Sequence, residues 1–284
     1  MKQVLLTGSN GFIGRKLKEK LIEMNYQVIE INSENGGVTN LKVLEGINYD
    51  NIVHVFHLAA KTFVPESWIN PEEYYKINTM GTLNILGVCR KNKIKLTFIS
   101  SYIYGEPEVL PISEMHTLNP SSPYAHSKYL AEECCEFYAK QFDTDIVVIR
   151  PFNIYGIGQS EHFLIPHIIN QAINEKEIRV KDLTPRRDYI YLEDLIEVLI
   201  LTLNIKKGYS VFNVGSGCSY CVKEIIDIVQ KVLNTNKVVL SDDIIRTNEI
   251  SDVVADITRV KESFDWHPKY SFVEGIQAIL DGLK

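Results

Sequence analysis

A tyrosine and a lysine four residues apart, in the stretch Tyr124-Ala-His-Ser-Lys128, are the side chains best suited to proton chemistry. On a helix this spacing puts both on one face, with their Cβ atoms about 5–6 Å apart. A positive charge at that distance favours the phenolate and lowers the pKa of the tyrosine from about 10 toward neutral pH. Such a tyrosine can give a proton to a carbonyl or take one from an alcohol. Exposed surface pairs share this spacing, so the surrounding elements decide its meaning.

A glycine motif near the N-terminus is the second group with chemical potential. Residues 3–7 form a short apolar run that predicts a strand, and this run ends in Gly8-Ser-Asn-Gly11-Phe-Ile-Gly14. A helical pattern with Leu17, Leu21 and Ile22 on one face follows. Strand, glycine turn and helix together favour dinucleotide binding, because the glycines allow close approach of a pyrophosphate and the helix N-terminus supplies N–H donors.

The end of the second predicted strand, Gln27–Asn32, is where NAD-binding units usually carry an acid for the ribose 2′-hydroxyl. Asn32 carries no charge to repel a 2′-phosphate, and no arginine beside it would bind one. Glu30 should point to the same face, less far along the strand. The choice between NAD and NADP therefore stays open. The short segment 33–50 has room for one small helix, at Leu41–Glu45.

Strands and helices alternate along the rest of the chain. We expect strands at 52–60, 95–100, 145–150, 177–181, 211–214 and 237–240, and helices at 72–92, around Tyr124, at 163–174, 194–203 and 222–233, and from 272. This alternation predicts an α/β fold, a Rossmann doubly wound parallel sheet with a smaller α/β substrate-binding cap. Ligands bind outside the carboxyl ends of such strands, where Ser100 and Ser101 lie.

The composition limits the class of protein. Its 45% hydrophobic and 23% charged residues are ordinary for a soluble globular protein. A net charge of −6 and a pI near 5.7 argue against nucleic acid or a membrane as partner. No apolar run approaches the roughly 18 residues of a membrane span, and the N-terminus does not read as a signal peptide, so we expect a cytoplasmic protein.

The five cysteines do not form a metal site by their pattern. Cys218-Ser-Tyr-Cys221 has zinc-like spacing, but no second Cys or His pair accompanies it. The adjacent Cys134 and Cys135 suit neither a metal nor an unstrained disulfide. With Cys89, which lies in an apolar helical stretch, we expect reduced packing or capping residues and no bound metal.

Taken together, these motifs resemble one family. The order and spacing of the extended short-chain dehydrogenase/reductases is found in Thr7-Gly8-x-x-Gly11-x-x-Gly14, His57-Leu-Ala-Ala60, Ser100, Tyr124-x-x-x-Lys128 and Arg150-Pro-Phe-Asn153. Within this family the chain is similar to the NAD-dependent epimerase/dehydratase group, which acts on nucleotide-diphosphate sugars. The resemblance runs from Lys2 to about Gly282 and includes Asn119-Pro120, Arg187-Asp-Tyr-Ile-Tyr-Leu-Glu-Asp194, Phe212-Asn-Val-Gly215 and Trp266-His-Pro268.

The resemblance implies a role for each matching residue. Tyr124 would be the acid/base, Lys128 would lower its pKa and hydrogen-bond the nicotinamide ribose, and Ser100 would donate to the reacting sugar oxygen. NAD or NADP would be held by Gly8, Gly11, Phe12, Ile13, Asn32, Leu58, Ala59, Ala60, Asn78, Tyr124, Lys128 and Pro151. The sugar nucleotide would be bound by Ser100, Asn153, Arg187 and Arg246, the arginines clamping the diphosphate. For Arg246 a solvated surface position is the alternative, and His57 should be structural.

Two departures from the family pattern bear on the reaction. Ser101 and Tyr102 replace the Asp-Glu pair of the dehydratases, which disfavours 4,6-dehydration. Asn32 with the short 33–50 segment is commoner among the family's sugar reductases than among its 4-epimerases. We therefore expect reduction of a 4-keto-6-deoxyhexose carried on dTDP, GDP or CDP, a reaction of polysaccharide biosynthesis. A UDP-hexose-type 4-epimerase that retains NAD and, more remotely, a non-catalytic dinucleotide sensor are the alternatives.

We also expect a division into two parts. The dinucleotide-binding domain should comprise 1–160 plus about 187–214, and the nucleotide-sugar-binding cap 161–186 plus 215–284. The family resemblance further implies a homodimer, in which the helices that bear Asn78 and Tyr124 pack as a four-helix bundle.

Overall fold

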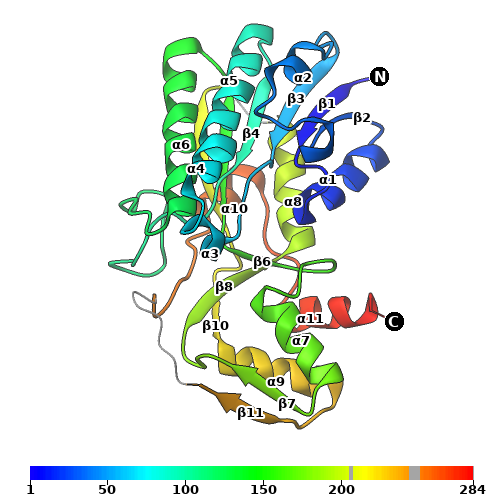
Figure 1. Cartoon of the computed structure of the whole chain (residues 1–284), viewed down its shortest axis with the longest axis vertical. Coiled ribbons are helices and arrows are strands. Elements are labelled where there is room, and N and C mark those ends of the chain that lie inside the picture. Colours follow the sequence, from blue (N-terminus) through cyan, green and yellow to red (C-terminus); the bar gives the residue numbers. More distant parts are fainter. Residues whose placement is uncertain (205–206, 243–249, 284) are drawn as a thin grey trace. The chain divides into compact units, whose positions relative to one another are not determined.

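The largest sheet has six strands. A computed structural model, which describes residues 1–204, 207–242 and 250–283, gives them as β1 (Gln3–Thr7), β2 (Gln27–Ile31), β3 (Ile52–His57), β4 (Lys95–Ile99), β5 (Ile146–Pro151) and β9 (Tyr209–Val214). Their order is β2-β1-β3-β4-β5-β9 (Figure 1). β1 pairs in parallel with β2 and β3, and β4 pairs in parallel with β3 and β5. The predicted parallel sheet of a Rossmann-like α/β fold is confirmed.

Contacts within the chain divide it into two compact units. Unit 1 comprises Met1–Gly105, Glu114–Pro151 and Ile196–Phe212, and unit 2 comprises Glu106–Ser113, Phe152–Leu195 and Asn213–Lys284. This division differs from the predicted boundaries chiefly at 152–160 and 187–195, which belong to unit 2. They do so because residues 153–155 pair with 189–191 in a separate sheet.

The helices that surround this sheet include the predicted helices after Gly14, at Leu41–Glu45, around Tyr124 and near Asp194–Leu203, together with short helices that were not predicted. They are α1 (Phe12–Glu23), η1 (Ser33–Asn35), α2 (Leu41–Glu45), α3 (Val64–Ser67), α4 (Pro71–Tyr74), η2 (Tyr75–Met80), α5 (Gly81–Asn92), α6 (Pro123–Phe142), α8 (Leu192–Leu201) and η3 (Thr202–Asn204). The small helix at Leu41–Glu45 is confirmed. The single long helix predicted over 72–92 is wrong in detail, because η2 is a π-helical stretch between α4 and α5. Such stretches are frequent at functional sites.

The first helix shows how the apolar pattern was partly misread. Leu17 and Leu21 are fully buried, whereas Ile22, predicted on the same face, is 53% exposed. Ile22 follows Leu21 directly, and successive side chains are about 100° apart around a helix. The buried face of α1 is therefore narrower than the three residues suggested.

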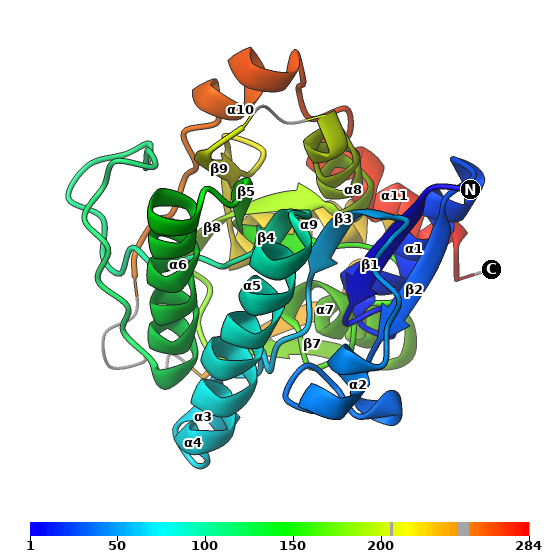
Figure 2. The ribbon, with the colours of Figure 1, turned by 90° about the horizontal axis from the view of Figure 1, so that it is seen from above.

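Local signals position the helix that bears the Tyr-Lys pair. α6 begins after Ser122, whose hydroxyl accepts from the Ala125 N–H at 3.1 Å, and Pro123 occupies its first turn. It ends at Asp143, which has φ 53°, in the left-handed region. α5 and α6 lie side by side (Figures 1 and 2). Their apolar residues pack into a core with the strands of the sheet, which includes Ile85, Leu86, Cys89, Ala131, Cys135, Phe98 and Val148.

Unit 2 has two small sheets of its own. Its elements are β6 (Asn153–Tyr155), α7 (Leu164–Asn174), β7 (Glu177–Val180), β8 (Arg186–Tyr191), β10 (Ser219–Cys221), α9 (Val222–Leu233), β11 (Val238–Ser241), α10 (Thr258–Phe264) and α11 (Phe272–Asp281). The strands run in the orders β10-β8-β6 and β11-β7. Tyr155, Tyr189 and Phe272 are among the residues of a separate core beneath α7, α9 and α11. The strands β6, β8 and β10 were not predicted, because β6 and β10 have only three residues each and β8 begins with three charged residues.

Candidate active site

The glycine turn between β1 and α1 permits close backbone approach. Gly8 has φ 74°, in the left-handed region that favours glycine, and a Cβ there would lie 2.8 Å from the Ala59 nitrogen. A Cβ on Gly14 would lie 2.1 Å from the Gly8 carbonyl oxygen. In the structure as described, Gly11 at the N-cap of α1 provides no side-chain hydrogen bond, and the first turn of α1 contains no acidic residue. Its first N–H groups, which include those of Phe12 and Ile13, therefore suit an anion.

The residues that follow β3 lie against this turn. The N–H groups of Leu58 and Ala59 both donate to the Thr7 hydroxyl oxygen, at 3.2 and 3.1 Å. Leu58 N–H also donates to the Thr7 carbonyl at 3.2 Å. The strand ends of β1 and β3 are thereby joined, and Ala60 continues directly from them. The structure thus brings the predicted dinucleotide residues of both segments together at one edge of the sheet.

Asn32 lies just beyond β2, not inside it as predicted, because its side chain caps η1. Its Oδ1 accepts from the N–H groups of Glu34 and Asn35 at 3.1 and 3.2 Å, and Asn35 Oδ1 accepts from the Asn32 N–H at 2.9 Å. Glu30 is paired with Lys18, 2.7 Å away, and this contact lowers the pKa of Glu30. The end of β2 therefore presents the Asn32 amide and a Glu30 carboxylate that is ionised and paired with Lys18.

Lys128 is buried beside the end of β4. Its Nζ donates to the Ile99 carbonyl at 2.5 Å and lies 4.1 Å from the centroid of the Phe98 ring. Burial lowers the pKa of Lys128 to about 7, against the smaller opposing influences of Cys135 and Glu132. The ammonium of this lysine is therefore close to its titration point near neutral pH.

Ser100 follows the carbonyl that Lys128 contacts. Its N–H donates to the Ile149 carbonyl at 2.8 Å, which fixes it between β4 and β5. Its hydroxyl is buried and has no hydrogen-bond partner within the described parts of the chain. A buried hydroxyl without a partner is costly, so this oxygen is available for a ligand.

Tyr124 occupies the first turn of α6. Desolvation by the surrounding protein raises the pKa of Tyr124, and the smaller influence of Ser101 opposes this rise. The expected lowering of the Tyr124 pKa by Lys128 is thus not found in this structure, where the Lys128 ammonium contacts Ile99. The Tyr124 ring meets the Tyr74 ring edge to face, with centroids 6.4 Å apart. Tyr124 is therefore held as a phenol.

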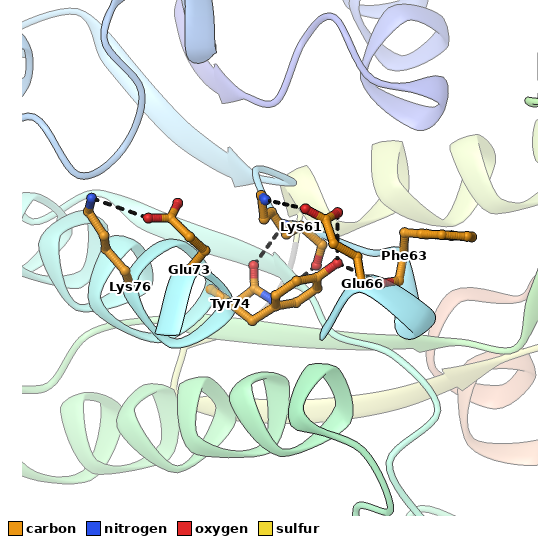
Figure 3. Close-up of polar contacts among 7 residues, drawn as sticks. Lys61, Phe63, Glu66, Glu73, Tyr74 and Lys76 are labelled. Carbon is orange, nitrogen blue, oxygen red and sulfur yellow. Dashed lines mark hydrogen bonds and ion pairs between the residues drawn. The ribbon is translucent and has the colours of Figure 1, made fainter. Parts of the chain in front are cut away.

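The segment after Ala60 holds Tyr74 in place (Figure 3). Tyr74 is fully buried, and its hydroxyl donates to the Phe63 carbonyl at 2.6 Å. Lys61 pairs with Glu66 at 2.9 Å, and its Nζ lies 5.6 Å from the Tyr74 ring centroid. This cluster supports one side of Tyr124.

Asn78, predicted to contact the cofactor, joins three segments of the protein. Its Oδ1 accepts from Lys61 N–H at 2.8 Å, and its Nδ2 donates to the Lys61 carbonyl at 3.0 Å and to Ser127 Oγ at 2.9 Å. The Ser127 hydroxyl donates in turn to the Tyr124 carbonyl at 2.7 Å. Every polar atom of the Asn78 side chain is therefore engaged within the protein, in the π-helical stretch η2.

His57 lies in a buried chain of hydrogen bonds. Thr7 Oγ1 already accepts from two backbone N–H groups, so its proton goes to His57 Nδ1, 2.7 Å away. His57 Nε2 then carries the ring proton and donates to Thr82 Oγ1 at 2.9 Å, and Thr82 donates to the Asn78 carbonyl at 2.5 Å. The neutral ring therefore has a structural role, which agrees with the sequence-based expectation.

Acid should destabilise the fold through the buried His54 and His57. Burial lowers the pKa of each from 6.5 to about 3. Below pH 6.5 the unfolded chain binds protons that the folded chain does not, so stability is lost as the pH falls from 6.5 toward 3. Each histidine should cost about 2 kcal/mol at pH 5 relative to pH 8.

Urea unfolding at these two pH values measures the effect, with His57→Asn as the comparison. The variant should be less stable at pH 8, yet it should lose about half of the pH dependence that the two histidines contribute. A pH dependence identical to that of the wild type would contradict a neutral, buried His57.

The predicted sugar-nucleotide residues of unit 2 lie on adjacent strands. Asn153 on β6 donates to the Asp188 carbonyl at 3.1 Å, and Arg187 on β8 donates to the Arg186 and Ile250 carbonyls, both at 2.7 Å. The Asp188 carboxylate is buried and accepts from four donors on Ser216, Gly217 and Ala255. Arg246 lies outside the described residues.

Three site residues escaped prediction. Tyr74 contacts the Tyr124 ring, and Lys61 contacts Tyr74, through tertiary packing alone. No local pattern marks Tyr74. For Lys61, the one available signal is its position directly after Ala60. Ser101, which influences the Tyr124 pKa, was placed at the carboxyl end of its strand and noted as a departure from the dehydratases, but it was not assigned a role at the site. In each case the missing information is a contact between distant segments.

Other features bear on what the chain can bind. All five cysteines are free. In the described ranges no group of three His, Cys, Asp or Glu residues is arranged to hold a metal ion. Among the same residues, no helix combines the length and the apolar character needed to cross a lipid bilayer.

Comparisons with known proteins agree with this geometry. The sequence model of the NAD dependent epimerase/dehydratase family matches residues 4–215. The chain is 33% identical to a putative UDP-glucose 4-epimerase of Methanocaldococcus jannaschii, over 99% of this chain and 98% of that protein. It is 26% identical to the GDP-6-deoxy-D-mannose reductase of Pseudomonas aeruginosa, over 98% and 96% of the two chains. The structure of RMD from Pseudomonas aeruginosa with NADPH is 26% identical, covers 99% and 98% of the two chains, and superposes with a TM-score of 0.91.

Proposed function

Because this chain belongs to the NAD-dependent epimerase/dehydratase family, we propose that it is a nicotinamide-dependent oxidoreductase acting at C4 of a nucleotide-diphosphate hexose. In this proposal it reduces a 4-keto-6-deoxy sugar. The supporting observation is that the glycine turn, the unpartnered Ser100 hydroxyl and the Tyr124–Lys128 face of α6 all belong to unit 1, at the carboxyl ends of its strands.

The proposed chemistry assigns a task to each of three side chains. Tyr124 gives its hydroxyl proton to the C4 oxygen, and the Ser100 hydroxyl donates a hydrogen bond to the same oxygen. The Lys128 ammonium stabilises the phenolate that Tyr124 becomes. When bound, the reduced nicotinamide supplies the hydride that adds to C4, and it is left oxidised. Tyr124 regains its proton from solvent, which completes the cycle.

The residues present fit a dinucleotide. Any side chain at Gly8 or Gly14 would collide with backbone atoms, so the turn keeps the close packing that a pyrophosphate site needs. Phe12 and Ile13 begin α1, whose positive end carries no acid. Leu58, Ala59 and Ala60, which follow β3, and Pro151, which ends β5, would flank the cofactor.

The end of β2 favours the reductase over the epimerase. The Asn32 side chain caps η1, and the Glu30 carboxylate is paired with Lys18. Within β2 and the residue after it, both described, no unpaired carboxylate is left to hold the ribose of a permanently bound NAD. An exchangeable cofactor suits a reductase, which consumes one reduced nicotinamide per turnover. The 4-epimerase is the second candidate, because a relative of that name is 33% identical over nearly the whole chain.

Unit 2 would bind the sugar nucleotide. Asn153 and Arg187 lie on neighbouring strands, and a planar guanidinium suits a diphosphate. Arg246 is proposed as the second arginine of this clamp. The assays below determine which nucleotide the sugar carries.

Mass spectrometry of small molecules released from the purified protein, followed by assays, tests the proposal. With dTDP-, GDP- or CDP-4-keto-6-deoxyhexose, NADH or NADPH should be oxidised in a one-to-one ratio with product. A tightly bound NAD that is never consumed, together with interconversion of UDP-glucose and UDP-galactose, would instead identify the epimerase. Dinucleotide binding without turnover of any of these sugars would contradict both and favour a sensor.

A further inference from the structure

A fully buried ion pair lies behind the Tyr124–Lys128 face. Glu132 and Arg150 have side chains that are only 3% and 5% exposed. Arg150 Nε donates to both Glu132 oxygens at 3.0 Å, and its Nη2 donates to Oε2 at 2.6 Å. Within the described parts of the chain, the carboxylate contacts of this guanidinium go to Glu132, in a bidentate arrangement that fixes its orientation.

The guanidinium also reaches a third segment. Its Nη1 donates to the Tyr104 hydroxyl at 2.9 Å and, more weakly, to the Glu114 carbonyl at 3.4 Å. Tyr104 is buried and follows Ser100 by four residues, Arg150 directly precedes Pro151, and Glu132 lies on α6. One side chain therefore ties together the segments that carry Ser100, Pro151 and the Tyr124–Lys128 pair.

Stability alone does not account for this arrangement. Burying two charges costs desolvation, and well-packed apolar residues in place of a buried pair are often as stable or more so. Apolar residues in place of the pair could not hydrogen-bond three segments in one fixed arrangement. They would also put no negative charge near Lys128. Glu132 is one turn from Lys128 on the same helix face, the spacing at which side chains meet.

Of the two acidic groups that act on the Lys128 pKa, Glu132 is the charged one, and it is itself paired with the Arg150 cation. From β4 it meets the Ile99 carbonyl and the Phe98 ring, and from β3 the neutral His57. Cys135 follows on its own helix, but burial raises the pKa of that thiol well above its usual value, so it stays uncharged near neutral pH.

We infer that the Glu132–Arg150 pair is a positioning device for the active site: Arg150 fixes the Ser100 segment against α6, and the Glu132 carboxylate favours the ammonium form of Lys128. The inference rests on the proposed function for its catalytic consequence. Neither residue touches the reacting atoms, so both act through others. Their effect should appear in the ionisation of Lys128 and not only in the amount of folded protein.

The variant Glu132→Gln tests this, because it removes the charge and keeps the shape. The pKa of Lys128, followed by the ¹³C signal of its Cε in the protein without added ligands, should fall by about half to one unit. The signal is assigned by its loss in Lys128→Met. The alkaline limb of kcat/KM should move to lower pH by the same amount, because that limb reports the free enzyme. Activity should therefore fall at pH 8 and largely recover at pH 6.

Two further variants keep the test decisive. Tyr104→Phe removes one Arg150 partner and leaves the Glu132 charge, so it should lower kcat without moving the Lys128 titration. Glu132→Gln combined with Arg150→Leu removes both charges of the pair, so the Lys128 pKa should fall in the same direction but by less than in the single variant, and this variant carries the test if the single variant does not fold. A Lys128 titration identical to the wild type in a folded variant would overturn the inference. Absence of wild-type turnover would contradict the proposed function instead, and the Cε titration would still decide the inference.

Discussion

Tyr124→Phe should lower kcat for the reduction of a 4-keto sugar by roughly 10²–10⁴-fold, the usual loss when a general acid is removed. Phenylalanine keeps the ring and its edge-to-face contact with Tyr74, so α6 should keep its position. The protein surroundings already raise the pKa of Tyr124 and hold it as a phenol. The phenol proton is therefore present for the reductive direction, and the variant lacks it.

The matched control for this variant is Tyr129→Phe, which removes a hydroxyl from the same helix five residues further on. It should leave kcat within about twofold, since surface-side changes are usually small. Dinucleotide affinity, measured by the fluorescence of NADH or NADPH, should be similar in both variants and the wild type. A loss of less than tenfold in Tyr124→Phe would mean that another group supplies the proton.

The fold could be predicted far better than the electrostatics of the site. The glycine turn, the strand ends and the helix bearing Tyr124 all follow from local patterns, because period, turn residues and caps are properties of neighbouring positions. Ser100 was found in this way, at the end of β4. The Tyr124 pKa was not, because it depends on desolvation and on where the Lys128 ammonium points, and Lys128 contacts the Ile99 carbonyl.

The features that were missed involve pairs of residues far apart in sequence. Asn78 was expected at the cofactor, and the contacts of its amide with Lys61 and Ser127 were not foreseen. The π-helical stretch around it was not foreseen either, because one wider turn inside a helix hardly changes the apolar period of the sequence. The Glu132–Arg150 pair joins residues 18 apart. Arg150 was noted only as part of the Arg150-Pro-Phe-Asn153 motif and Glu132 not at all, because a buried ion pair has no local signature and its partners come from different elements.

Gly14→Ala should weaken dinucleotide binding by roughly 5–150-fold, since forced overpacking costs about 1–3 kcal/mol and each 1.4 kcal/mol corresponds to about tenfold in Kd. The new Cβ would lie 2.1 Å from the Gly8 oxygen and 2.9 Å from Ser9 Cα, and these are backbone atoms that cannot rotate away. The turn must therefore move, and with it the N–H groups at the start of α1. Titration of cofactor fluorescence measures the affinity, and thermal unfolding separates it from loss of fold.

Gly87→Ala is the matched control for Gly14→Ala, because both are helical glycines and no described atom lies within 4 Å of a Cβ at Gly87. Alanine is the better helix former by about 1 kcal/mol, so this variant should be as stable as the wild type or slightly more so, with unchanged affinity. Equal affinity in the two variants would contradict a dinucleotide seated on the glycine turn. A loss confined to Gly14→Ala, in a protein that still unfolds cooperatively, would place the pyrophosphate there, since backbone crowding at that position is what distinguishes the two sites.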